Sequence, residues 1–346
     1  MTRAIALLSG GLDSTLAVKL VADQGIHVTA LTFMTHFGCS AGIEGSSCGH
    51  DVSWLKGQPF VEIRLCHLGK EYIDMVRRPK FGYGRNMNPC IDCRIFMLRW
   101  AKEYLEINGG DFLITGEVVG QRPMSQRLET FPRIDREAGL EGLVLRPLSA
   151  QVLPPTKPEM EGKIDRSRLR GIWGRSRREQ LKMAAEYGLI DIPTPAGGCL
   201  LTDPGFSRKL KDLFLYTEDP QANDIQLLKA GRHFRLSPYL KVVIGRNEGE
   251  NAVIESLLLP GDRRLEAVDY FGPVTVVRGK AGAAEIEWAA RLTLRYGKCP
   301  RGTNALVRVV AVGSGAEQVV DVVASEPEGF ESVRVGATAA ARTAAE

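Results

Sequence analysis

Six residues close to the start of the chain constrain its fold more than any other feature. They read Ser9-Gly10-Gly11-Leu12-Asp13-Ser14, between an apolar run at 3–8 and a helical stretch at 15–24. Two adjacent glycines let the backbone bend sharply and bring its N–H groups up to an anion. A helix that begins at the same point adds partial positive charge. The pattern therefore predicts a phosphate-binding turn between a buried strand and a helix.

Other interpretations of these six residues can be weighed against that one. A strand-to-helix turn capped by Asp13 or Ser14 would need no ligand. A Walker A motif is excluded because no Gly-Lys-Ser/Thr follows, and the dinucleotide fingerprint is excluded because its third glycine is missing. Ser9 and Ser14 can donate hydroxyl hydrogen bonds to phosphate oxygens. The Asp13 carboxylate suits an anion site only if a magnesium ion or a helix cap satisfies it.

Strand-like and helix-like segments alternate through the first part of the chain. Strand-like runs lie at 27–34, 59–66 and 111–116, and apolar residues recur at helical spacing over 91–107. This alternation implies an α/β fold with a doubly wound parallel sheet. Such sheets bind ligands at the carboxyl ends of their strands.

The sequence suggests four regions. We expect a nucleotide-binding domain at 1–150, a basic connecting segment at 151–218, a smaller α/β or α+β domain at 219–335 and a disordered tail at 336–346. Further elements are expected as a helix at 176–188, strands at 233–237, 240–245, 274–278, 305–312 and 318–324, and helices at 250–258 and 281–296.

Composition narrows the class of protein. The 346 residues suffice for two or three domains, and a net charge of +4 argues only weakly for a nucleic-acid partner. No apolar run approaches the ~20 residues of a membrane span. Without a cleavage signal near Met1, we expect a cytoplasmic protein with no membrane partner. Seven scattered cysteines do not resemble a disulfide framework.

Three cysteines stand in patterns typical of chemistry. Asn88-Pro89-Cys90-Ile91-Asp92-Cys93 opens a predicted helix, and Cys199 follows two glycines. A helix N-terminus favours the thiolate, and the Cys90/Cys93 spacing lets both sulfurs hold one metal centre. A thioredoxin-like pair would follow a different strand context, and a structural zinc would need a fourth ligand. The other cysteines are expected to be bystanders, although Cys39, Cys48 and His50 could form a small metal loop.

The six-residue turn resembles the SGGxDS motif of PP-loop (N-type) ATP pyrophosphatases, which have the adenine nucleotide alpha-hydrolase-like fold. The resemblance implies that Mg²⁺-bound ATP is cleaved between its α- and β-phosphates and that AMP passes to a carbonyl oxygen. Asp13 would then be catalytic. The implied nucleotide site comprises Ser9, Gly10, Gly11, Asp13, Ser14, Thr32, Phe33, Gly116 and Gln121, with the adenine near Thr32 and Phe33.

The order of the three motifs resembles tRNA thiolation enzymes, the 2-thiouridylases and 4-thiouridine synthases. In one branch, a CxxC pair and a distant cysteine hold a 4Fe-4S cluster, which here implies Cys90, Cys93 and Cys199 as ligands. In another branch two cysteines carry a persulfide and its resolving thiol, which implies Cys93 and Cys199 as catalytic residues. The extra Cys90 favours the cluster. The implied partners are tRNA and a sulfur donor, either sulfide or a persulfide carrier protein; a homodimer stays open.

One basic segment suggests RNA binding. Arg166–Arg178 interleaves arginines with Trp173, and a solvated helix face with Trp173 half-buried is the alternative. Gln121–Arg127, just after a predicted strand, and Arg146, which ends the next apolar run, are expected near the active site. Residues 229–251, with Ile244-Gly245-Arg246-Asn247 and Asn251, resemble the RNA-binding domain of the NFACT family; an ordinary accessory domain is the alternative. Two other functions stay open. One is an ATP-dependent ligase or amidotransferase for a small molecule, and the other a non-enzymatic ATP- and RNA-binding protein, which the paired cysteines disfavour.

Overall fold

The chain forms two compact units, Met1–Thr202 and Asp203–Glu346, in a computed structural model that describes residues 1–38, 55, 57–189 and 199–336. The basic segment expected at 151–218 is thus divided between the two units. The expected tail beyond Gly336, and the possible metal loop of Cys39, Cys48 and His50, lie outside the described residues.

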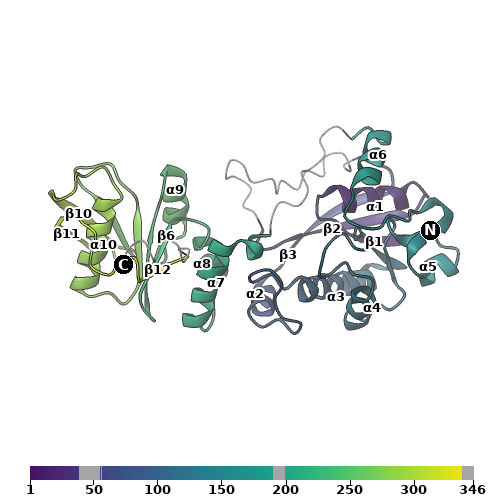
Figure 1. Ribbon diagram of the computed structural model, residues 1–346, viewed down its shortest axis with the longest axis horizontal. Coiled ribbons are helices and arrows are strands. Elements are labelled where there is room, and N and C mark those ends of the chain that lie inside the picture. Colours follow the sequence, from purple (N-terminus) through teal and green to yellow (C-terminus); the bar gives the residue numbers. More distant parts are fainter. Residues whose placement is uncertain (39–54, 56, 190–198, 337–346) are drawn as a thin grey trace. The chain divides into compact units, whose positions relative to one another are not determined.

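The N-terminal unit contains a parallel five-stranded sheet in the order β3-β2-β1-β4-β5 (Figure 1). Its strands are β1 (Arg3–Leu7), β2 (His27–Met34), β3 (Val61–His67), β4 (Phe112–Thr115) and β5 (Val144–Leu145). The predicted doubly wound parallel sheet is confirmed. In this order the chain reverses direction across the sheet between β1 and β4, and such a switch point is where ligands bind.

Helices cover both faces of this sheet (Figure 1). They are α1 (Leu12–Ala22), α2 (Lys70–Arg77), α3 (Cys90–Asn108), α4 (Thr130–Glu137), α5 (Lys157–Met160) and α6 (Arg178–Glu186). The helices expected at 15–24, 91–107 and 176–188 correspond to α1, α3 and α6. Short α2 and α4 were not predicted; each carries only three buried side chains among its eight residues.

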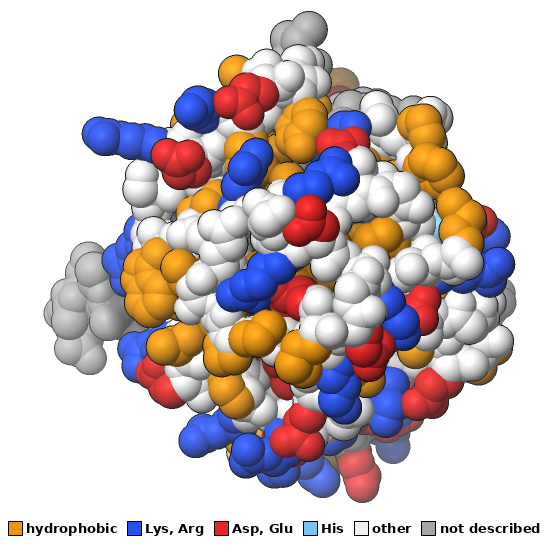
Figure 2. Space-filling model, turned by 90° about the vertical axis from the view of Figure 1, so that its right-hand side faces the viewer, with side chains coloured by type: hydrophobic (Ala, Val, Ile, Leu, Met, Phe, Trp, Pro, Cys, Tyr) orange, Lys and Arg blue, Asp and Glu red, His pale blue; other side chains and the backbone are white. Residues whose placement is uncertain are grey.

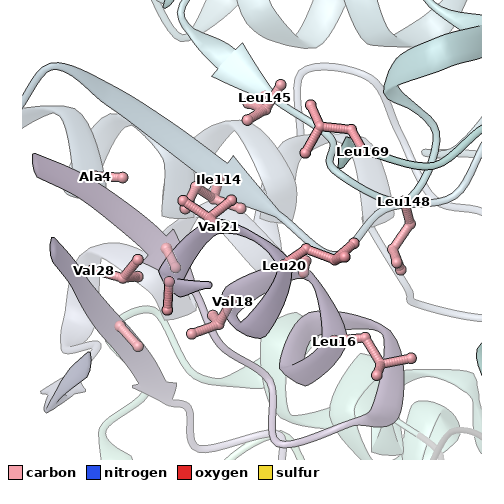
Figure 3. Packing of buried hydrophobic residues seen from close by; sticks show 14 of the residues in the cluster. Ala4, Leu16, Val18, Leu20, Val21, Val28, Ile114, Leu145, Leu148 and Leu169 are labelled. Carbon is pink, nitrogen blue, oxygen red and sulfur yellow. The ribbon is translucent and has the colours of Figure 1, made fainter. Parts of the chain in front are cut away.

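Alternate residues of β1 supply two separate cores. Ala4 and Ala6 face the side of α1, whereas Ile5 and Leu7 pack with residues of α3 and α4. Figure 3 shows Val18 and Val21 of α1 over the strand residues of the first core. A strand buried on both faces is expected in a parallel sheet, and small alanines let α1 approach β1 closely.

The C-terminal unit has a different architecture. Its seven strands lie in the order β11-β10-β8-β9-β7-β6-β12, and every neighbouring pair is antiparallel. The strands are β6 (Arg232–Ser237), β7 (Leu240–Ile244), β8 (Arg263–Ala267), β9 (Thr275–Gly279), β10 (Asn304–Ala311), β11 (Glu317–Val323) and β12 (Arg334–Val335). The helices are α7 (Pro204–Tyr216), α8 (Ala222–Leu227), α9 (Glu248–Ser256) and α10 (Ala283–Arg295). Of the two expected classes, this is the α+β one.

The surface carries charges of both signs. On the face shown in Figure 2, Lys and Arg side chains are interspersed with Asp and Glu, which agrees with the small net charge of +4. None of the helices within the described ranges combines the length and apolar character needed to span a bilayer.

Candidate nucleotide and cysteine site

The turn between β1 and α1 is held by its own serines. Ser14 Oγ donates to the carbonyl of Gly11 at 2.8 Å and accepts from the backbone N–H of Ser9 at 3.2 Å. Gly10 has a φ of +74°, a conformation that glycine adopts without strain. The Ser14 hydroxyl hydrogen, which we expected to face phosphate, is thus directed into the turn. The N–H groups of the first helical turn have no partner within α1 and remain available to an anion.

The end of β4 packs directly against this turn. A β-carbon on Gly116 would overlap the backbone N and Cα of Ser14 and lie 2.7 Å from the carbonyl carbon of Asp13. Only glycine fits there. Gln121 lies beyond the same strand end, and its Nε2 donates to Oδ2 of Asp13 at 2.7 Å. Gln121 is in turn within 3.4 Å of Gln180 of α6, which is fully buried.

Oδ1 of Asp13 is the one carboxylate oxygen of the turn that needs a partner. It is buried and lacks a hydrogen bond within the described part of the chain, while Oδ2 is bonded to Gln121. A buried carboxylate oxygen beside a phosphate-binding turn has the chemistry that Mg²⁺ prefers. This oxygen therefore fits the magnesium ion expected with ATP.

The residues expected near the adenine lie at the carboxyl end of β2. Thr32 is 1% exposed, and its Oγ1 has no hydrogen-bond partner among the described residues. Phe33 is half-buried and makes an edge-to-face contact with Trp100 of α3, with ring centroids 5.6 Å apart. Because successive residues of a strand point to opposite faces, the Thr32 hydroxyl lies on the α1 side of the sheet, whereas Phe33 packs on the α3 side. The unpaired buried hydroxyl of Thr32 is therefore the group at this strand end that could bond a heterocycle.

A buried ion-pair network links the strand end to the cysteine helix. Glu117 is 1% exposed and lies between Arg94 of α3, at 3.0 Å, and Arg146, at 3.2 Å. Arg146 also forms a two-pronged pair with Asp135 at 2.7 and 2.9 Å. The pKa of Arg146 is raised because these carboxylates outweigh the effect of burial. Arg146, which we read as a residue of the active-site region, is therefore buried in a structural network.

Cys90 and Cys93 lie in the first turn of α3. Sγ of Cys93 is 3.0 Å from the hydroxyl of Tyr72 in α2. Tyr72 was missed by the sequence analysis, because nothing in its surroundings marks it as a partner of a cysteine. Burial and the nearby thiols, those of Cys93, Cys199 and Cys90, raise the pKa of the Tyr72 phenol well above its ordinary value. Of the three predicted cysteines, Cys93 contacts the Tyr72 phenol directly, so Tyr72 belongs to the same site as the first turn of α3.

The backbone next to Cys199 is hydrogen-bonded to segments near the first turn of α3. The N–H of Leu200 donates to the carbonyl of Phe37 at 3.3 Å, just after β2. The carbonyl of Leu201 accepts from the N–H of Met87 at 3.1 Å, three residues before Cys90. Cys199 itself is exposed, whereas Cys90 and Cys93 are half-buried. A cysteine about a hundred residues away in sequence thus approaches the first turn of α3.

The expected lowering of the thiol pKa at this helix start is wrong. Burial raises the pKa of Cys93 and also that of Cys90, and the charges of Arg122 and Arg94 only partly offset it at Cys90. Desolvation disfavours the thiolate more than the helix end favours it.

The sulfurs of Cys90, Cys93 and Cys199 are not arranged as a metal site in the described part of the chain. Across the residues that the structure describes, no three His, Cys, Asp or Glu side chains converge closely enough to hold a metal ion. Three thiols are nevertheless the donors that an iron–sulfur group requires, and the hydrogen bonds of Leu200 and Leu201 hold the chain beside Cys199 near the first turn of α3. Of the remaining described cysteines, Cys66 and Cys299 are buried, as bystanders would be.

In the C-terminal unit, the motif residues hold one turn together. Glu250 accepts from the N–H of Gly231 at 3.1 Å and pairs with Arg246, and Asn247 caps α9 by accepting from the N–H of Glu250 at 2.9 Å. Asn251 Oδ1 accepts from the N–H of Val274 at 3.1 Å. The motif therefore fixes the β7–α9 turn and leaves Arg246 about half exposed.

Family models match both units. The model of the thiamine biosynthesis protein (ThiI) matches residues 1–151, and the model of the NFACT protein RNA binding domain matches residues 231–332. These matches agree with the motifs at Ser9–Ser14 and at 229–251.

Curated relatives match over different lengths. The tRNA-specific 2-thiouridylase MnmA of Thermosynechococcus vestitus is 24% identical over 298 residues, which cover 82% of this chain and 75% of that protein. A probable tRNA sulfurtransferase of Finegoldia magna is 33% identical over 151 residues, or 43% of this chain and 36% of the relative. The chain thus spans only about a third of the length of some relatives that it matches.

Solved structures give more distant similarities. A 4-thiouridine synthetase–RNA complex with bound ATP is 18% identical, with a TM-score of 0.37 and coverage of 62% of this chain and 51% of that one. The U34-tRNA thiolase NcsA of Methanococcus maripaludis with its [4Fe-4S] cluster is 16% identical, with a TM-score of 0.33 and coverage of 66% and 71%. Residues 1–151 are thus similar to the thiamine biosynthesis protein (ThiI), and residues 231–332 are similar to the NFACT protein RNA binding domain.

Proposed function

We propose that this chain is a tRNA sulfurtransferase, which activates a uridine carbonyl with ATP and replaces its oxygen with sulfur. One observation carries the proposal: the phosphate-binding turn and the cysteine helix meet at one strand end. Gly116 packs on Ser14, and the next residue, Glu117, pairs with Arg94, the residue after Cys93. A nucleotide site and a sulfur site this close together are what a two-step thiolation needs.

The first step is adenylation. The uridine carbonyl oxygen attacks the α-phosphorus of ATP, the bond from that phosphorus to the bridging oxygen breaks, and pyrophosphate leaves. The turn at Ser9–Ser14 would hold the phosphates through its backbone N–H groups, and Asp13 would supply its unpaired Oδ1 to a magnesium ion, which would neutralise phosphate charge. The residues mainly position the reactants and stabilise charge.

The second step exchanges oxygen for sulfur. A sulfur nucleophile adds to the activated ring carbon, and AMP departs with the original carbonyl oxygen. Cys90, Cys93 and Cys199 are the candidates for holding that sulfur. Tyr72, at 3.0 Å from Cys93, orients its thiol.

The three cysteines would serve as ligands of a 4Fe-4S cluster. Held by three thiolates, such a cluster has one iron open to bind sulfide. The alternative is a persulfide on Cys93 or Cys199, delivered by a carrier protein. Cys90 separates the two mechanisms, because a persulfide pair does not need a third thiol.

The substrate is a tRNA, to which the NFACT-type unit adds affinity. The N-terminal unit would contact the tRNA through Arg166–Arg178 and Gln121–Arg127. We expect the protein to act on tRNA in the cytoplasm.

The test is anaerobic incubation with tRNA, Mg²⁺, ATP and sulfide, followed by mass spectrometry of the tRNA nucleosides. We expect one pyrophosphate and one AMP for each thiouridine formed. Asp13→Ala should abolish pyrophosphate, AMP and thiouridine alike. Cys199→Ala should abolish thiouridine and the AMP released with it, while pyrophosphate still forms as the uridine is adenylated. Nucleosides that stay unmodified while a small acceptor elicits AMP would instead identify a ligase or amidotransferase.

A further inference from the structure

An exposed tryptophan is fixed in place at the edge of the nucleotide site. The side chain of Trp173 is 56% exposed, although hydrogen bonds to neighbouring segments hold the backbone on either side of it. Trp173 bridges to Val119, and the N–H of Gly174 donates to the carbonyl of Val119 at 2.7 Å. The hydroxyl of Ser149 donates to the carbonyl of Ile172 at 2.7 Å and accepts from the N–H of Val119 at 3.1 Å. An exposed indole on a fixed backbone can stack on a base without having to be ordered first.

The segment Glu117–Gln121 connects this indole to both parts of the proposed chemistry. A β-carbon on Gly120 would lie 3.5 Å from the indole Nε1 of Trp173. Gln121 donates to Asp13 of the phosphate-binding turn. At the start of the segment, Glu117 pairs with Arg94, the residue after Cys93, at 3.0 Å. Successive α-carbons are about 3.8 Å apart, so the indole lies only a few residues' length from both the ATP turn and the cysteine helix.

The two segments that meet at Trp173 carry exposed arginines close to it in sequence. Arg122, Arg175 and Arg178 are exposed, and within the described ranges none of them forms an ion pair. Unpaired arginines are suited to phosphates, and an indole is suited to the face of a base. A nucleic-acid strand satisfies both requirements at once, whereas a small acceptor would not use several arginines.

We infer that Trp173 is a stacking platform for a base of the tRNA, at or beside the uridine that reacts, and that it positions this base between the ATP turn and the cysteines. The inference rests on the proposed function. It adds a substrate-positioning residue and a place for the RNA on the N-terminal unit. Adenine of ATP is the competing occupant, and the experiment separates the two.

The experiment compares Trp173→Leu, which keeps apolar bulk, with Trp173→Phe, which keeps an aromatic face. Rates of thiouridine formation are measured against tRNA concentration, and ATP affinity is measured by calorimetry. We expect Trp173→Leu to lose roughly 5- to 150-fold in kcat/KM for tRNA, which corresponds to ~1–3 kcal/mol for one stacked base. Trp173→Phe should retain most of the activity, and ATP affinity should stay within about twofold of the wild type, since a stacked base leaves the phosphate turn untouched. Leu181→Ala, on the 45% exposed Leu181 of α6, is the matched control and should behave as wild type.

A second readout does not depend on catalysis. The difference in tryptophan emission between the wild type and Trp173→Phe comes from Trp173 itself. Binding of tRNA should quench that part of the emission in the wild type. Absence of quenching, or an unchanged kcat/KM for Trp173→Leu, overturns the platform, and a loss confined to ATP affinity assigns the indole to adenine instead. A wild type that forms no thiouridine refutes the proposed function, and the quenching still decides whether a base stacks on Trp173.

Discussion

Gly116 and Ser14 are in backbone contact, so the end of β4 and the phosphate-binding turn leave no room for even a methyl group between them. The contact joins residues a hundred positions apart at the switch point of the sheet. It holds the turn against the end of β4, and any side chain at position 116 must displace the turn.

Gly116→Ala should therefore impair ATP use while the fold persists. Overpacking of this kind costs ~1–3 kcal/mol, and the strain falls on the turn. We expect at least about a tenfold drop in pyrophosphate release, measured with saturating tRNA. Gly69→Ala is the matched control, because a β-carbon there would meet only a Glu71 side-chain oxygen at 3.4 Å. Equal activity of the two variants would show that the contact between Gly116 and Ser14 does not affect how the turn uses ATP.

Gln121→Met should weaken the use of magnesium-bound ATP. The substitution removes the hydrogen bond to Oδ2 of Asp13 and leaves the carboxylate free to rotate. Hydrogen bonds to charged groups contribute ~1.5–3 kcal/mol, so kcat/KM for ATP should fall roughly 10- to 150-fold. Gln180→Met should have a smaller effect, because Gln180 reaches Gln121 only at 3.4 Å. The reverse order of severity, in a titration of rate against Mg²⁺ and ATP, would contradict this assignment.

The sequence was informative where a feature is local. The turn at Ser9–Ser14, the β1 strand before it and the parallel sheet all follow from short patterns of glycine, apolar and polar residues. Helix α7 was missed although Asp203 caps it and Pro204 occupies its first position, because Pro204 and Gly205 read as part of a linker. The predicted start of α1 is also three residues late, because Leu12–Ser14 were assigned to the turn.

Contacts between distant segments could not be predicted from one sequence. Nothing near Glu117 indicates that it lies between Arg94 and Arg146, and nothing near Tyr72 indicates Cys93. The prediction that the helix start lowers the thiol pKa failed for a related reason. Helix position is visible in sequence, but the burial that raises the pKa of Cys93 depends on how α2 packs on α3.

The C-terminal unit should become more stable as the pH rises above neutral. Burial lowers the pKa of Lys241 to about 7, below its ordinary value of 10.5. Its folded-state pKa is thus below the unfolded one, so protonation favours unfolding, and stability is lost as the pH falls from 10.5 towards 7. Urea unfolding of residues 203–346, followed by Trp288 emission, should give a higher midpoint at pH 9 than at pH 7.

Lys241→Met isolates the contribution of that lysine. It removes the buried amine while Asp212 keeps its pair with Arg235 at 2.7 Å. The midpoint at pH 7 should rise, and its difference from pH 9 should shrink. Lys209, whose pKa burial lowers to about 8, retains part of the pH dependence. An unchanged pH dependence in Lys241→Met would show that Lys241 is not responsible.

Removal of residues 203–346 should weaken tRNA binding far more than ATP binding. The ATP turn and the cysteines belong to the unit that remains. The affinity of the whole chain for tRNA should fall steeply with salt, since arginine–phosphate contacts release counterions. Fluorescence anisotropy with labelled tRNA at several salt concentrations measures both effects. Equal tRNA affinity of the truncated and whole chains would exclude the C-terminal unit as a docking domain.

The cysteines distinguish the two sulfur mechanisms. If Cys90, Cys93 and Cys199 hold a 4Fe-4S cluster, protein purified without oxygen should be brown and contain about four irons per chain. Alanine at any one of the three positions should remove the colour and stop thiouridine formation, while pyrophosphate release continues. Cys299→Ala is the matched control, because that thiol is buried in the other unit and should be dispensable. The persulfide mechanism predicts instead a colourless active protein in which Cys90→Ala is tolerated. Iron analysis of anaerobic protein, set beside the activity of Cys90→Ala, decides the matter, and an iron-free preparation with full activity would rule out the cluster.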